Sequence, residues 1–155
     1  MERALGTVKA VVFQLKDEEY GVDVQQVLSI ERMQPITRVP KTPPFVKGVI
    51  NLRGIVTPII DLRERFSIET SDYSDSTRIV IVSYDGMDVG LIVDSANDVI
   101  DIPEDAIEPP PEVVGQVDVD YLHGVAKLED RLLILLNLNK VLTVEELKEI
   151  ENIEG

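Results

Sequence analysis

The sequence predicts an all-β protein built from a duplicated β module. Short apolar runs with the two-residue alternation of strands recur between polar or glycine-containing turns. One pattern also occurs twice, because residues 124–138 repeat the arrangement of residues 48–62 at a separation of 76 positions (124 − 48). Gly21 and Gly90 occupy matching places in a second pair of similar segments. Stable solenoids usually need three or more units, so two copies favour paired lobes.

The stretch 48–62 predicts a hairpin whose turn is Arg53-Gly54. Glycine supplies the positive φ that a two-residue hairpin turn requires. Pro58 cannot donate a hydrogen bond to a ladder, so its strand is expected at a sheet edge or beside a bulge. Arg53 then stands out as a long cation at the tip of an otherwise apolar hairpin.

The first half of the chain begins with the same kind of hairpin. Residues 8–15 alternate as a strand, 20–24 return as a second strand, and a short apolar strand is expected at 27–30. Four prolines between positions 35 and 44 exclude a helix from the connection that follows. Residues 61–66 fit one short helix whose first residue, an aspartate, is the N-cap.

The second half follows a polar join at 67–75 and opens on a hairpin at 79–93. A strand is expected at 99–102, and the proline-rich, acidic stretch 103–119 is predicted to be a loop.

Residues 121–128 and 132–136 complete the second set of strands. Since 132–136 is apolar on both faces, it is expected to be a central strand where the two halves share their core.

The end of the chain predicts a helix at 143–154 that packs on the body. Its first turn begins with a capping box of Thr143 and Glu146. The whole chain, 1–155, is therefore predicted to be a single domain, with one lobe at about 8–66 and the other at about 76–142.

The charge of the chain is strongly acidic but uneven. Its formal net charge of −14 argues against binding to a nucleic-acid backbone, which needs a basic face. Residues 32–65 nevertheless carry seven basic and two acidic side chains, a local charge of +5. A positive region on an acidic protein indicates an acidic partner and a preferred docking face, although acidity for solubility alone also explains the net charge.

The sequence shows no recognisable catalytic or cofactor site. It has no cysteine, one histidine (His123) and no phosphate-binding, nucleophile-elbow or calcium-loop motif, so no metal and no cofactor are expected. The absence of a signal peptide and of a membrane-length apolar run predicts a cytoplasmic protein without membrane insertion. A small β-barrel enzyme using paired carboxylates remains the alternative, and low aromatic content disfavours an oligosaccharide or oligonucleotide binder.

The hairpin motif Gly48-Val-Ile-Asn-Leu-Arg-Gly, followed by Pro58-Ile-Ile-Asp-Leu, resembles the signature of the CheW family of bacterial chemotaxis coupling proteins. The similarity extends to residues 19–24, 38–48, 89–94 and 131–137, and Thr57 departs from it where an aliphatic residue is usual. The resemblance implies two five-stranded β-barrel lobes that share an apolar core.

The resemblance also implies a non-enzymatic adaptor. Such proteins connect the cytoplasmic tip of a methyl-accepting chemoreceptor to the regulatory domain of the histidine kinase CheA in membrane-associated signalling arrays. A CheV-like protein or a detached kinase regulatory domain is the alternative within this class.

By motif, the resemblance places the receptor contacts on one set of residues: Val27, Ile30, Gly48, Asn51, Leu52, Arg53 and Gly54. Kinase contacts are expected on the second lobe at Ala96 and Val99. An internal brace from Arg53 to an acid such as Asp61 is the alternative role for the arginine.

Overall fold

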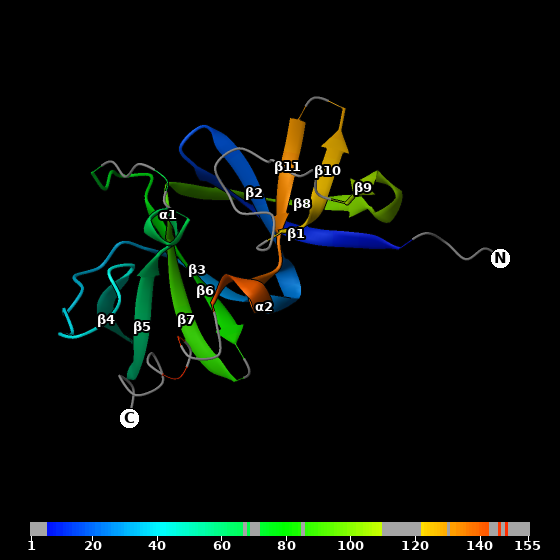
Figure 1. Cartoon of the computed structure of the whole chain (residues 1–155). Helices are drawn as coiled ribbons and strands as arrows, with labels where there is room; N and C mark the ends of the chain where they lie inside the picture. The colour runs from blue at the N-terminus through cyan, green and yellow to red at the C-terminus, as the bar shows by residue number, and fades with distance from the viewer. Residues whose placement is uncertain are drawn as a thin grey trace.

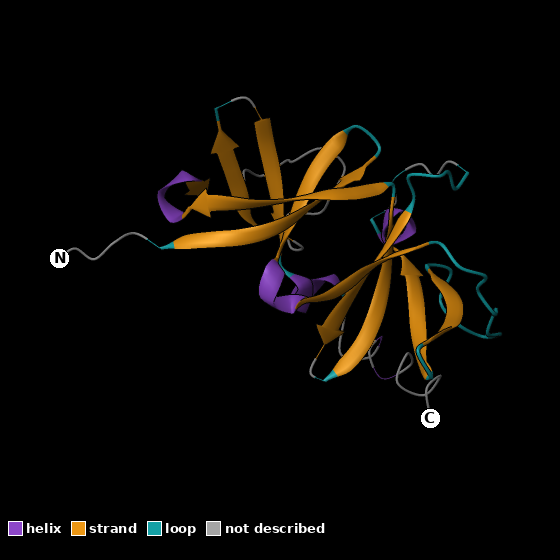
Figure 2. Cartoon of the chain, turned by 180° about the vertical axis from the view of Figure 1, so that it is seen from behind, coloured by secondary structure: helices purple, strands orange, loops and turns teal. Residues whose placement is uncertain are grey.

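The computed structural model describes residues 6–66, 68, 72–84, 86–109, 122–129, 131–142, 146 and 148. Within this part of the chain the strands form two sheets, each strongly curved (Figures 1 and 2). The six-stranded sheet has the order β8-β1-β2-β11-β10-β9, with β8 (Ser95–Pro103), β1 (Thr7–Leu15), β2 (Glu18–Asp23), β11 (Arg131–Leu136), β10 (Leu122–Leu128) and β9 (Ile107–Glu108). The five-stranded sheet has the order β3-β6-β7-β5-β4, with β3 (Val27–Arg32), β6 (Arg78–Tyr84), β7 (Met87–Val93), β5 (Ile55–Asp61) and β4 (Val46–Leu52).

Short helices join these strands. Two are single 3₁₀ turns, η1 (Val24–Gln26) and η2 (Glu104–Ala106), and two are single α turns, α1 (Leu62–Arg65) and α2 (Leu138–Val141). The predicted N-cap of α1 is confirmed, because Asp61 Oδ1 accepts a hydrogen bond from Arg63 N at 3.0 Å. Most of the predicted helix 143–154 lies outside the described residues.

The mainly-β, two-lobed fold is confirmed, but the predicted division of the chain into lobes 8–66 and 76–142 is wrong. β1 and β2 belong to the first half of the chain and join β8–β11, whereas β6 and β7 belong to the second half and join β3–β5. Each lobe is therefore assembled from both halves. Pairing among the described strands also leaves both sheets open rather than closed as barrels.

The duplication predicted from the sequence explains how the halves exchange strands. In the five-stranded sheet, β5 runs parallel to β7 with Ile59 opposite Gly90. In the six-stranded sheet, β11 runs parallel to β2 with Leu135 opposite Gly21. Each glycine leaves room for the apolar side chain facing it, because an added Cβ would lie 2.5 Å from Ile59 Cδ1 at Gly90 and 3.0 Å from Leu135 Cδ2 at Gly21.

The apolar core consists of one cluster shared by both sheets and two smaller clusters, each formed by one sheet alone, which we call the private cores. Side chains of both sheets meet in the largest cluster, in which Tyr20 and Phe13 stack with ring centroids 5.9 Å apart. Each sheet also encloses a smaller cluster on its other face. On β11, Ile134 and Leu136 point into the shared cluster, and Leu133 and Leu135 point into the private one. The predicted central strand buried on both faces is thus confirmed.

Two local predictions hold only in part. The register of β4 shifts between Val46 and Gly48, close to the residue that pairs with Pro58, as the bulge alternative predicted. Pro58 does not lie on an edge strand, however, because β5 lies between β7 and β4. It is accommodated because the parallel pairing with β7 begins only at the next residue, Ile59. The predicted loop 103–119 contains η2 and the short strand β9, since Ile107 packs on the private core of the six-stranded sheet. Among the described residues, no helix has the length and apolar character needed to cross a membrane.

Candidate docking surface

The β4–β5 hairpin holds Arg53 at its tip. Arg53 and Gly54 both have positive φ, +53° and +87°, as a tight hairpin turn of type I′ requires. Asn51 closes the turn, since its Oδ1 accepts a hydrogen bond from Gly54 N at 2.8 Å. The Arg53 side chain is 68% exposed, and its guanidinium is therefore available to a partner. A side chain at positive φ is unfavourable, and such strain is common at functional sites.

Glu31 of β3 orients the Arg53 side chain. Arg53 Nη2 lies 3.2 Å from Glu31 Oε2, so the contact brings the hairpin tip beside a strand at the opposite edge of the same sheet. Exposed apolar side chains flank this ion pair along the chain, with Ile30 before Glu31 and Ile55 after Gly54. We call Ile30, Glu31, Asn51, Arg53 and Ile55 the tip surface.

The structure divides the predicted receptor residues into two groups. Ile30, Asn51, Arg53 and Gly54 are exposed at the tip surface or its turn. Val27 is half-buried against the shared core, and Leu52 is buried in the private core of the five-stranded sheet. Gly48 is buried as well. An added Cβ at Gly48 would lie 2.0 Å from the carbonyl oxygen of Thr37. The backbone that comes close to Gly48 is therefore a segment of this chain and not of a partner.

The alternative of an internal brace from Arg53 to an acid holds in part, because Arg53 does pair with an acid of this chain, but that acid is not Asp61. Asp61 is buried at the other end of β5, where both of its carboxylate oxygens accept hydrogen bonds from Arg63. The acid that contacts Arg53 is Glu31 instead.

The predicted kinase residues lie on the other sheet. Ala96 and Val99 belong to β8, which is an edge strand of the six-stranded sheet among the described strands. Ala96 is buried in the shared core, whereas Val99 is 51% exposed. Val99 is therefore the member of this pair that a partner can reach, and Ala96 can only help to position the strand.

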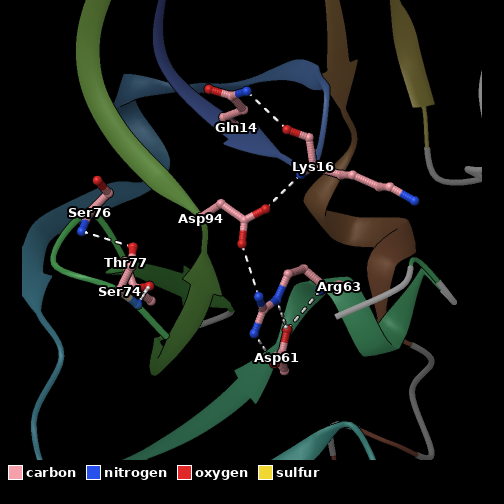
Figure 3. Close-up of polar contacts among 8 residues, drawn as sticks. All are labelled: Gln14, Lys16, Asp61, Arg63, Ser74, Ser76, Thr77 and Asp94. Carbon is pink, nitrogen blue, oxygen red and sulfur yellow. Dashed lines mark hydrogen bonds and ion pairs between the residues drawn. The ribbon is translucent and has the colours of Figure 1, made fainter. Parts of the chain in front are cut away.

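A buried arginine that the sequence analysis missed connects the two sheets (Figure 3). Arg63 is 2% exposed and binds Asp61 through Nε at 3.1 Å and Nη2 at 3.0 Å. Its Nη1 reaches Asp94 Oδ1 at 2.9 Å, where the chain passes from β7 to β8. The second Asp94 oxygen accepts a hydrogen bond from Lys16 N at 2.6 Å, in the β1–β2 turn of the other sheet.

Ion pairing explains how a charged arginine can be buried in this network. Burial lowers the pKa of Arg63, but the hydrogen bonds and charge of Asp61, together with the charge of Asp94, outweigh burial and raise the pKa above its usual value. Arg63 therefore stays charged, and its single positive charge is shared between the buried Asp61 and the partly exposed Asp94. From the sequence, only the contact between the helix-capping aspartate and the arginine two residues later could have been anticipated. The contact with Asp94 could not, because Asp94 lies 31 positions further along the chain.

The described residues contain no group of three or more His, Cys, Asp or Glu side chains that could hold a metal ion. In the Arg63 network, Asp61 and Asp94 are two neighbouring carboxylates, but they do not form a pair because Arg63 lies between them. The described surface presents an exposed cation with apolar neighbours on one sheet, and the exposed Val99 on an edge strand of the other.

Comparison with known proteins shows the family to which this chain belongs. A family model described as a CheW-like domain matches residues 9–146. The chain belongs to the CheW-like family. Its CheW relatives include the chemotaxis protein CheW of Bacillus subtilis, which is 48% identical over 138 residues covering 88% of each chain. The chemotaxis protein CheW of Klebsiella aerogenes is 37% identical over 143 residues, covering 92% of this chain and 86% of that protein.

A solved structure shows the same CheW fold. The crystal structure of the scaffolding protein TtCheW from Thermoanaerobacter tengcongensis superposes with a TM-score of 0.83 at 42% identity. The match covers 90% of this chain and 94% of that one. The two-lobed arrangement with exchanged strands is therefore a CheW fold, and the family is one of chemotaxis scaffold proteins.

Proposed function

We propose that this protein is a non-enzymatic chemotaxis adaptor that couples the cytoplasmic tip of a methyl-accepting chemoreceptor to the regulatory domain of the kinase CheA. Family membership supports the general role. The observation that supports a coupling role is that two exposed candidate docking sites lie on different sheets, the tip surface on one and Val99 on the other. Two partners can then bind one molecule at the same time, at receptor arrays on the cytoplasmic side of the membrane.

The tip surface suits the helical tip of a receptor. Ile30 and Ile55 offer apolar contact to one face of a helix. The guanidinium of Arg53 donates several hydrogen bonds in fixed directions, which favours carbonyl and carboxylate acceptors. Three other predicted receptor residues act indirectly. They lie beneath the surface and hold in place the strands that carry the exposed residues, and they are Val27, Gly48 and Leu52.

The edge of the six-stranded sheet suits the kinase. The regulatory domain of CheA is expected to have a related β fold, and an edge strand offers both free backbone groups and the exposed Val99 side chain. Ala96 supports this edge from the shared core.

Replacing Arg53 with alanine tests the receptor side of the proposal. We expect Arg53→Ala to bind a purified receptor-tip fragment at least tenfold more weakly, a loss of about 1.4 kcal/mol or more. Its free energy of unfolding should change by less than about 1 kcal/mol, because the Arg53–Glu31 pair is exposed to solvent. Affinity can be measured by calorimetry and stability by urea unfolding.

Lys127→Ala is the matched control for this experiment. Lys127 is 66% exposed and also forms an ion pair, with Glu108, but it lies on the six-stranded sheet. The control should bind the receptor fragment as the wild type does. Unchanged binding by Arg53→Ala, or an equal loss in both variants, would refute the assignment of the receptor to the tip surface.

A further inference from the structure

A groove of about 470 Å³ lies at the end of β4 that is remote from the tip surface. The β3–β4 connection forms most of its wall, with Val39 and Pro40 among the apolar lining, and Tyr73 closes one side. Lys47, which lines the groove, lies at the start of β4, whereas Arg53 directly follows the end of β4. Lys47 and Arg53 are six positions apart, or about 20 Å along an extended strand, so the groove is separate from the tip surface.

Three cations line this groove, namely Arg38, Lys41 and Lys47. Lys47 forms an ion pair with Glu64. Arg38 and Lys41 are exposed, and neither has a carboxylate partner among the residues that the structure describes. Two uncompensated cations beside a third are unusual on a chain whose net charge is −14. This groove is therefore a second positive site, besides the exposed Arg53, on a chain that is acidic as a whole.

The backbone of the loop that carries Arg38 and Lys41 is restrained at several positions. Lys41 has a φ of +64°, which side-chain-bearing residues rarely adopt. The prolines at 40 and 43 restrict the backbone on both sides. Thr42 Oγ1 donates a hydrogen bond to the carbonyl of Val39 at 3.1 Å. A loop that is already ordered loses little conformational entropy when a ligand binds, which favours affinity.

We propose that this groove binds an extended acidic peptide segment of a partner protein. Carboxylates of the peptide would pair with Arg38 and Lys41, and apolar residues between them would pack on Val39 and the ring of Tyr73. The Lys47–Glu64 pair shows a carboxylate already bound at the same rim. A groove that combines cations with apolar side chains favours a peptide over a small free anion. The inference does not rest on the receptor and kinase assignments.

The experiment measures binding of a fluorescein-labelled peptide, Glu-Val-Glu-Val-Glu, and of a second peptide with glutamine in place of glutamate. Wild-type protein should bind the glutamate peptide at least tenfold more tightly, and added salt should weaken that binding. Arg38→Gln/Lys41→Gln should reduce the affinity for the glutamate peptide at least tenfold. Lys9→Gln/Lys127→Gln is the control, because it removes the same charge from exposed ion pairs on the other sheet and should leave affinity within twofold.

Several outcomes would overturn the proposal. Equal losses of affinity in both double variants would mean that net charge alone, and not this groove, attracts the peptide. Competition by inorganic phosphate as effective as competition by unlabelled peptide would indicate a general anion site. Self-association of the wild type in sedimentation, abolished by Arg38→Gln/Lys41→Gln, would make a second copy of the chain the occupant. Absence of any preference for the glutamate peptide would remove the site altogether.

Discussion

Gly48→Ala should destabilise the protein by about 3 kcal/mol or more, since two separate penalties combine at this position. Gly48 has a φ of +141°, which disfavours any residue with a Cβ atom. The new Cβ would also lie 2.0 Å from the carbonyl oxygen of Thr37. That carbonyl cannot move away freely, because it accepts a hydrogen bond from Val49 N at 2.9 Å and Thr37 N donates one back to Val49 O.

Gly54→Ala provides a control in the same hairpin. Gly54 also has positive φ, +87°, but an added Cβ would meet no atom within 4 Å. Only the backbone penalty remains, so we expect a loss of about 1 kcal/mol in the free energy of unfolding. Urea unfolding of both variants gives the comparison. If the two substitutions cost the same, the close approach of Thr37 is not a determinant of the fold.

Arg63→Met should lower the free energy of unfolding by about 3–5 kcal/mol, because it leaves a buried carboxylate without its counter-ion. Asp61 is 2% exposed and depends on Arg63 for both of its oxygens. The same substitution removes the ion pair between Arg63 and Asp94, which is one of the contacts at the junction of the two sheets. Arg131→Met is the comparison at a more accessible site. Arg131 binds Glu19 and Asp98 but is 28% exposed, and its loss should cost about 1 kcal/mol.

A second substitution separates the buried charge from the lost packing. The double variant Asp61→Asn/Arg63→Met no longer contains the unpaired carboxylate. The helix cap is kept, because the side-chain oxygen of asparagine can also accept a hydrogen bond from a backbone N–H. The protein already shows this at the matching repeat position, where Asn137 Oδ1 accepts from Asn139 N at 3.2 Å. The double variant should therefore be more stable than Arg63→Met by about 1–2 kcal/mol. A double variant less stable than Arg63→Met would contradict the charge argument.

The repeat in the sequence predicted local structure well and strand partners poorly. Asp61 and Asn137, 76 positions apart, cap equivalent helices, and the apolar run 132–136 is the central strand that its pattern indicated. The exchange of strands between the halves was not predictable, because apolar alternation reports which face of a strand is buried and carries no information about its neighbour. The Arg63–Asp94 contact was missed for the same reason.

The candidate site was predicted in part. The motif correctly indicated the hairpin, and the structure shows Arg53, Asn51 and Ile30 exposed. Leu52 could have been recognised as an internal residue, because side chains alternate along a strand and Asn51 and Leu52 cannot both face solvent. The role of Gly48 needed coordinates, since its neighbour Thr37 comes from a connection whose path the proline content alone does not define.

Assembly from purified components tests the central claim most directly. The protein would be mixed with a receptor-tip fragment and the regulatory domain of CheA, and complexes separated by size-exclusion chromatography. The wild type should form a ternary complex, Arg53→Ala should keep only the kinase domain, and Val99→Lys should keep only the receptor fragment. Failure of the wild type to join both partners, or loss of both partners in either variant with the fold intact, would contradict an adaptor with two separate docking surfaces.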